Sequence, residues 1–101
     1  MDYKVILAPQ AIADLENAVR HIAKDNPQAA FRFGNLLLDR VTILKDFPEL
    51  GPAYRKRPSV RRLSSRPYII FYRVNHEQRI VEVMRYWHAA RGDVELGPPA
   101  A

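Results

Sequence analysis

The first half of the chain has the hydrophobic spacing of a short strand followed by two helices. Residues 3–7 are mostly aliphatic or aromatic, which predicts the strand. Pro9 follows, and the first turn of a helix tolerates a residue that lacks an N–H. We expect a helix from Pro9 to about Lys24, because apolar residues recur at helical spacing, at Ile12, Leu15, Val19 and Ile22.

A second helix is expected almost immediately. Asn26 is a favourable N-cap and Pro27 a favourable first helical residue, and the residue before a proline is disfavoured in the helical conformation. This helix should continue to about Asp46, with its apolar stripe at Ala30, Phe33, Leu37, Val41 and Leu44. So short a connection predicts an antiparallel helical hairpin, in which Gly34 allows close contact between the helices.

The second half has the pattern of strands. Prolines and a glycine in residues 47–52 end the helical region, and a basic loop follows. Three runs rich in β-branched and aromatic residues come next: Val60 to Ser64, Tyr68 to Asn75 and Arg79 to Trp87. The predicted fold class is α+β: an N-terminal strand, an antiparallel helical hairpin, then a C-terminal antiparallel meander of three strands. We expect residues 1–92 to form a single domain and residues 93–101 a flexible C-terminal tail.

Both faces of the predicted meander carry apolar side chains. In the middle strand Ile69 and Phe71 point one way, whereas Tyr68, Ile70, Tyr72 and Val74 point the other. The helical hairpin can cover only one face. The other face is covered either by a partner chain or by a sheet that curls around its own middle strand.

Composition narrows the class of protein. The chain has 101 residues and no cysteine, so it lacks disulfides and thiolate metal sites, as is usual in a reducing compartment. No stretch is long and apolar enough for a membrane span, and no signal peptide precedes the first strand. We expect a soluble, cytoplasmic protein that does not associate with membranes.

The net charge of +5 is confined to one half of the chain. Residues 1–50 hold six Lys/Arg and seven Asp/Glu, whereas residues 51–101 hold ten Lys/Arg and four Asp/Glu. The basic side chains expected to meet a partner are Arg55, Lys56, Arg57, Arg61, Arg73 and Arg91, together with the aromatic Trp87. Such a concentration attracts phosphates or an acidic protein surface, although a merely solvated face is the alternative.

Candidate chemistry is limited to proton transfer and phosphate binding. Cleavage of RNA by its own 2′-hydroxyl needs a base, an acid and cations, and Arg62, Arg73, Arg85 and His88 could fill these roles. The alternative is a strand-terminal His88 that packs on Trp87 or bonds to the backbone. Neither His21 nor His76 has a metal-ligand companion in sequence, and no phosphate-cradling glycine loop is present, so we expect no metal, no cofactor and no small-molecule substrate.

The ordered elements resemble the RelE/ParE superfamily of toxins. The resemblance covers residues 3 to about 92 and is carried by Leu7-Ala8-Pro9-Gln10-Ala11, Val60-Arg61-Arg62-Leu63, Ile70-Phe71-Tyr72-Arg73-Val74 and Trp87-His88-Ala89-Ala90-Arg91. It implies a toxin of a type II toxin–antitoxin module, held inactive by a cognate antitoxin, ParD-like or RelB-like, that wraps its surface in a hetero-oligomer.

The same resemblance implies one of two targets. RelE-like members cut mRNA on the ribosome without a metal, and they place an arginine where this chain has Ile69. ParE-like members act on DNA gyrase and need no nuclease residues. The sequence therefore favours a ParE-like inhibitor of gyrase that is not an enzyme; the alternative is an mRNA endonuclease that uses Arg62, Arg85 and His88.

Overall fold

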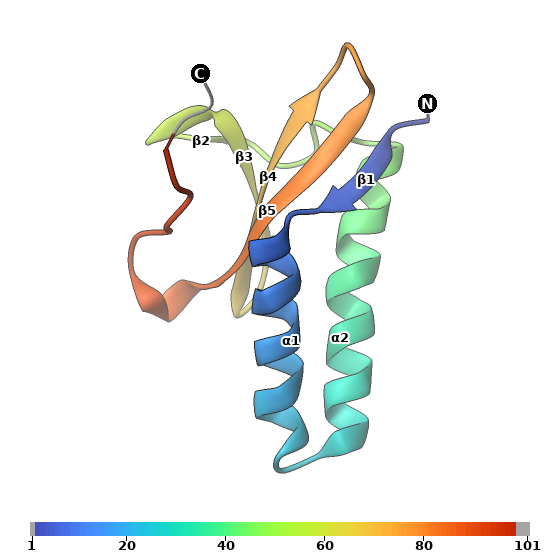
Figure 1. Ribbon diagram of the computed structural model, residues 1–101, viewed down its shortest axis with the longest axis vertical. Helices are drawn as coiled ribbons and strands as arrows, with labels where there is room; N and C mark the ends of the chain where they lie inside the picture. The colour runs from blue at the N-terminus through green and yellow to red at the C-terminus, as the bar shows by residue number, and fades with distance from the viewer. Residues whose placement is uncertain (1, 99–101) are drawn as a thin grey trace.

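The computed structural model describes residues 2–98, in which two helices lie against a five-stranded sheet (Figure 1). The elements are β1 (Lys4–Leu7), α1 (Pro9–Ala23), α2 (Pro27–Thr42), a 3-10 turn (Ile43–Lys45), β2 (Ala53–Tyr54), β3 (Arg57–Ser65), β4 (Tyr68–Asn75), β5 (Ile80–His88) and a second 3-10 turn (Ala89–Arg91). This order confirms the predicted α+β class.

The helical hairpin forms as the sequence predicted, although Ile12 of the predicted stripe is 45% exposed and the buried residues of α1 are Ala11 and Ala18. The Asn26 side chain accepts a hydrogen bond from the Ala29 N–H at 3.0 Å, and Pro27 begins α2. A Cβ atom added to Gly34 would lie 3.0 Å from Val19 Cγ2, so this glycine lies directly against α1. The α-helical hydrogen bonding of α2 ends at Thr42 rather than Asp46, and the next three residues form the tighter 3-10 turn.

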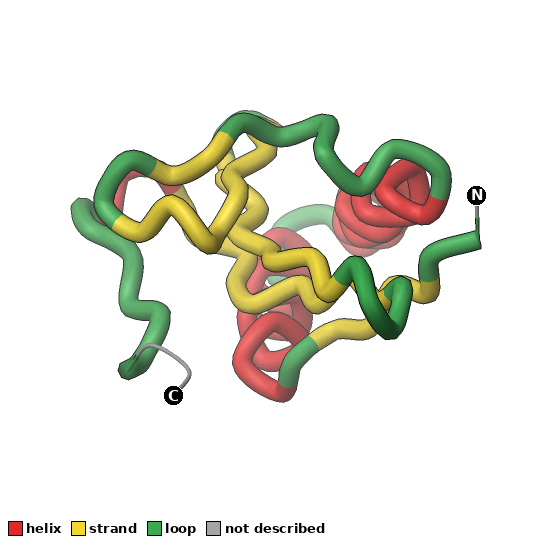
Figure 2. Tube along the Cα trace, turned by 90° about the horizontal axis from the view of Figure 1, so that it is seen from above, coloured by secondary structure: helices red, strands yellow, loops and turns green. Residues whose placement is uncertain are grey.

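The sheet is larger than the predicted meander. Its order is β1-β5-β4-β3-β2, with β1 parallel to β5 and every other pairing antiparallel. The sequence predicted only a basic loop where Ala53 and Tyr54 form β2, because a two-residue strand lacks a periodic signal. Viewed from above in Figure 2, the strands form one strongly curved layer.

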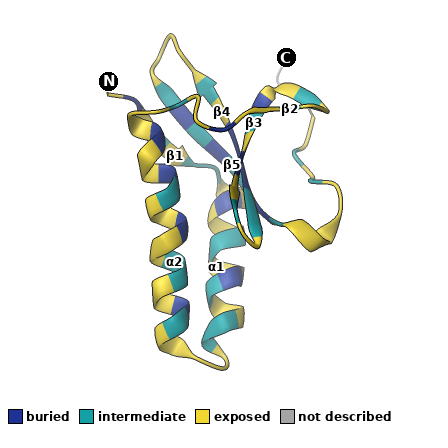
Figure 3. Ribbon diagram, turned by 180° about the vertical axis from the view of Figure 1, so that it is seen from behind, coloured by how far each residue is buried: buried dark blue, intermediate teal, exposed yellow. Residues whose placement is uncertain are grey.

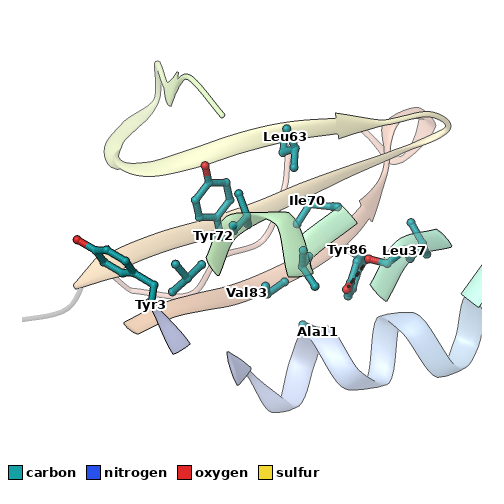
Figure 4. Packing of buried hydrophobic residues seen from close by; sticks show 11 residues of the cluster. Tyr3, Ala11, Leu37, Leu63, Ile70, Tyr72, Val83 and Tyr86 are labelled. Atoms are coloured by element: carbon teal, nitrogen blue, oxygen red, sulfur yellow. Dashed lines mark hydrogen bonds between the residues drawn. The ribbon is translucent and has the colours of Figure 1, made fainter. Parts of the chain in front are cut away.

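The main core lies between the helices and the sheet (Figure 4). Leu37 of α2 belongs to the same buried cluster as Ile70 and Tyr86, which point from β4 and β5 toward the helices. The Tyr86 hydroxyl donates a hydrogen bond to the Leu37 carbonyl at 3.2 Å, and burial raises the pKa of Tyr86 above its ordinary value. The outer faces of both helices are largely exposed (Figure 3).

The loop before β2 is fixed by a close approach of backbone to backbone. The Gly51 N–H donates to the Tyr72 hydroxyl at 2.8 Å, and Arg61 donates to the Gly51 carbonyl at 2.7 Å. A Cβ atom at Gly51 would lie 2.6 Å from the Arg62 carbonyl oxygen, inside van der Waals contact. Only glycine therefore fits here, which seats residues 47–52 against β3.

Within residues 2–98 no helix combines the length and the apolar character that crossing a bilayer requires.

Candidate functional site: the arginine face of the sheet

The face of the sheet turned away from the helices carries a row of basic and aromatic side chains. Arg62 of β3 pairs with Phe71 of β4, which in turn pairs with Arg85 of β5, so these three side chains lie on one face. The next row holds Ser64, Ile69 and Trp87. We call this surface the arginine face.

The arginine face has a small apolar core of its own. Val60, Phe71 and Trp87 are buried there, and the partly buried residues packed on them are Tyr54, Ile69, Met84, Val94 and Leu96. The Tyr54 ring meets the Phe71 ring edge-on, with centroids 5.1 Å apart. The second face of the sheet, for which a partner chain or a curled sheet was expected, is thus covered in part by β2 and by residues 94–96.

Those covering residues belong to the predicted flexible tail. Residues 93–98 follow the 3-10 turn Ala89–Arg91 and run back toward the β2–β3 hairpin, as the red segment of Figure 1 shows. Val94 and Leu96 are half buried, although neither lies in a helix or strand. Flexibility of this segment stays a prediction, and residues 99–101 lie outside the part that the structure describes.

Arg85 is bound from both sides of its guanidinium group. Its Nε donates to Asp14 Oδ2 at 2.8 Å and its Nη2 to Asp14 Oδ1 at 2.9 Å, and its Nη1 donates to the Glu95 carbonyl at 2.8 Å. The two charged side chains are only 11% and 9% exposed. The hydrogen bonds that Arg85 donates to Asp14 raise the pKa of the guanidinium above its ordinary value, so this cation stays charged and is paired with a carboxylate of the same chain.

Four other cations of the basic half are also paired. Lys56 binds Asp93 at 2.8 Å, and this hydrogen bond raises the pKa of the lysine. Arg73 binds Glu82 at 2.6 Å, and Arg61 lies 3.8 Å from Glu49. Arg57 Nη2 donates to the Gly97 carbonyl at 2.6 Å. These contacts are exposed or half exposed, so each contributes little to stability and can be exchanged.

Arg55 and Arg62 differ from these cations. Both are exposed, and neither forms an ion pair with a residue of the described range 2–98. They line one open pocket with Tyr54, Lys56 and neighbouring small residues, and no acidic residue contributes to its wall. This pocket is a part of the arginine face that is free to meet an anionic group.

Trp87 connects the arginine face with the end of the chain. Its indole Nε1 donates to the Gly92 carbonyl at 3.0 Å. The guanidinium carbon of Arg91 lies 3.9 Å from the centre of the indole ring, and that of Arg85 lies 4.9 Å from it. Both distances fit cation–π contacts, so Trp87 organises the two cations around it.

His88 lies on the other face of the sheet from Arg62 and Arg85. It pairs with Tyr68, whose ring packs on the main core, and the two rings meet edge-on at 5.2 Å. Its Nδ1 accepts a hydrogen bond from the Ala90 N–H at 3.1 Å. The fold therefore brings two of the three proposed nuclease residues into one row but separates the third from them. His88 instead shares a small pocket with His21, which sequence reasoning had set aside.

Asp14 is the residue of this site that sequence reasoning missed. Besides Arg85 it also binds the Tyr86 N–H at 3.0 Å, where β5 has continued beyond the end of β1. A signal for it exists, because Asp14 lies three and four positions from Ala11 and Ala18, on the buried side of α1. An acidic residue on such a buried stripe needs a hydrogen-bond donor that is also buried.

No group of three or more potential metal ligands occurs among residues 2–98.

The geometry defines a small α+β module with a basic surface on one face of its sheet, and comparison with known proteins identifies the class. The family model of the ParE toxin of the type II toxin–antitoxin system ParDE matches residues 5–92. The chain therefore belongs to the ParE toxin family, within the RelE/ParE superfamily, and is a type II toxin.

Solved structures share the fold. The chromosomal ParDE toxin–antitoxin system from P. aeruginosa contains a chain with a TM-score of 0.74 and 20% identity, covering 85% of this chain and 95% of that one. A chain of the toxin–antitoxin complex RelBE2 from Mycobacterium tuberculosis has a TM-score of 0.66 and 22% identity, covering 87% and 99%. The search of curated proteins gave no match.

Proposed function

We propose that this toxin inhibits DNA gyrase by binding to it in the cytoplasm, and that a cognate antitoxin neutralises it. Growth inhibition and plasmid stabilisation would follow from such a module. The observation that carries the proposal is the dispersal of the candidate nuclease groups: His88 projects from the face opposite Arg62, and Asp14 holds Arg85 in a bidentate pair. An inhibitor that acts by binding does not need these groups to be brought together in one catalytic site.

The arginine face supplies the surface for this binding. Arg55 and Arg62 are exposed beside Lys56, and charges of one sign in an open pocket speed the approach of an anionic partner. The match of residues 5–92 to the ParE toxin model supports gyrase as the target. The similarity in fold to chains of two toxin–antitoxin systems supports an antitoxin as the second partner.

The alternative is a RelE-like, ribosome-dependent mRNA endonuclease. Two observations favour it: Arg62 and Arg85 lie in the same row of the arginine face, and the fold resembles a chain of the RelBE2 complex. In this mechanism the two guanidinium groups would stabilise the charge of the phosphorane, and His88 would have to act from another copy of the site or after rearrangement. That extra requirement makes the alternative the weaker proposal.

Induction of the toxin in a host cell separates the two. We expect loss of plasmid supercoiling and a DNA-damage response, with mRNA on the ribosome left intact. Cleaved mRNA with unaltered supercoiling would support the endonuclease instead. The variant His88→Ala should arrest growth as strongly as the unchanged toxin, whereas loss of toxicity with folding and antitoxin binding preserved would contradict a gyrase-binding mechanism.

A further inference from the structure

The segment after Gly92 lies across the arginine face like a bound peptide. We call residues 93–97 the strap. Val94 and Leu96 alternate with acidic residues along it, and both pack on the apolar cluster of Val60, Phe71 and Trp87. The intervening side chains, Asp93 and Glu95, are exposed. The strap therefore has the pattern of an extended segment that places every second side chain in a groove.

Within residues 2–98, two of the three polar contacts that hold the strap are made to its backbone. Arg57 donates to the Gly97 carbonyl at 2.6 Å and Arg85 to the Glu95 carbonyl at 2.8 Å. The third is the ion pair between the side chains of Lys56 and Asp93, at 2.8 Å. Because backbone carbonyls occur in every peptide, these donors would bind another extended segment equally well.

The strap leaves part of the positive charge of the arginine face unpaired. Arg55 and Arg62 line the pocket next to Lys56 and form no ion pair with residues 2–98, the range described. A segment with more carboxylates than the strap would therefore have more ion pairs available. Such a segment must also compete with the strap, which is part of the same chain and therefore has an effective concentration of about millimolar. The competing segment needs additional contacts to displace the strap.

We propose that the arginine face is a groove for an extended peptide in which acidic residues alternate with aliphatic ones, and that the strap occupies it in the free toxin. The identification of that peptide as a segment of the antitoxin rests on the proposed function; the groove itself does not. On binding, the antitoxin segment displaces residues 93–97, takes over the donors Arg57 and Arg85, and adds contacts to Arg55 and Arg62. The antitoxin and the strap thus exclude each other.

Trp87 reports on displacement without a label, because it is the single tryptophan of the chain and binds the Gly92 carbonyl at 3.0 Å. The probe is a synthetic peptide with the sequence of residues 92–98. The protein is the full chain, unchanged or with Val94→Ser and Leu96→Ser, which loosen the strap. We expect the peptide to bind the loosened chain about tenfold more tightly than the unchanged chain, with a saturable change in Trp87 fluorescence.

Two matched controls define specificity. A peptide with serine in place of its valine and leucine should not bind saturably. Two longer peptides carry a short run of glutamates, one at the N-terminal end and one at the C-terminal end of the first peptide. At least one of them should bind the loosened chain more tightly than the first peptide does. The double substitution Arg55→Ala and Arg62→Ala in the protein should abolish that gain in affinity. If the doubly substituted chain does not fold, the single change Leu96→Ser replaces it, since it loosens the strap and leaves every donor of the groove in place.

Equal affinity for the unchanged and loosened chains, or no saturable binding to either, would overturn the groove. Glutamate extensions that leave affinity unchanged would overturn the role of Arg55 and Arg62. Neither assay contains gyrase or ribosomes, so failure here leaves the gyrase proposal intact, and an inactive toxin that still binds the peptide would contradict gyrase inhibition alone.

Discussion

Asp14 and Arg85, 71 positions apart in the sequence, form a bidentate pair that fastens α1 to the free edge of β5. The same carboxylate accepts the Tyr86 N–H. One side chain therefore satisfies both a cation and a strand-edge amide that β1 is too short to reach.

Removal of this carboxylate should be costly. Asp14→Ala leaves a nearly buried guanidinium without its anion, and we expect the free energy of unfolding to fall by about 3 kcal/mol. Denaturation by urea measures the change. The control is Asp93→Ala, which breaks the exposed pair with Lys56 and should leave stability unaltered within error. Similar losses in the two variants would contradict the distinction between a buried and an exposed pair.

Gly51 provides a test of backbone packing. Gly51→Ala places a methyl group 2.6 Å from the Arg62 carbonyl, so the loop must shift and the hydrogen bond to Tyr72 weakens. We expect a loss of about 2 kcal/mol. Gly34→Ala is the matched control: its methyl meets a valine side chain at 3.0 Å, and the gain in helix propensity, about 1 kcal/mol, offsets the crowding. A Gly51 variant as stable as the Gly34 variant would refute the close approach.

Buried tyrosines predict alkaline sensitivity. Burial raises the pKa of Tyr72 and Tyr86 in the folded state, whereas an unfolded tyrosine ionises near pH 10. The stabilisation is therefore complete below about pH 10 and is lost as pH rises through the folded pKa. Tyr86→Phe should cost about 1 kcal/mol at neutral pH, through the bond to Leu37.

Above about pH 10 the free energy of unfolding should fall less steeply with pH in Tyr86→Phe than in the unchanged chain, because one ionisable group is absent. The two slopes should differ by about 1.4 kcal/mol per pH unit. Urea denaturation across this range measures both slopes. Parallel slopes would show that Tyr86 ionises equally readily in the folded and unfolded chains.

The free arginines should matter to binding rather than to folding. Arg55→Ala with Arg62→Ala removes exposed groups that pair with no described residue, so we expect unchanged stability. Growth arrest on induction should weaken, and affinity for an acidic antitoxin should become less sensitive to salt. Arg66→Ala, also exposed but outside the pocket, serves as the control. Equal toxicity of all three proteins would remove these two arginines from the site.

The sequence predicted the elements well because their signals are local. The stripes of α1 and α2, the N-cap Asn26 and the alternation around Phe71 all appear within a few residues of one another. The resemblance built on those elements gave the correct superfamily.

What the sequence did not predict depends on long-range contacts. The parallel pairing of β1 with β5, the two-residue β2 and the packing of Leu96 on Trp87 have no periodic signature. For the site, the count of charges located the basic half but did not distinguish Arg85, neutralised by Asp14, from Arg62, which is exposed. Which cations are free is decided by neighbours distant in sequence.

The central claim is that the toxin acts by binding gyrase, and an assay with purified components tests it most directly. Gyrase, ATP and relaxed plasmid are incubated with the toxin, with and without a molar excess of antitoxin. We predict that the toxin alone suppresses supercoiling and that antitoxin restores it. Undiminished supercoiling at a large excess of folded toxin, together with cleavage of mRNA on purified ribosomes by the same preparation, would contradict the claim.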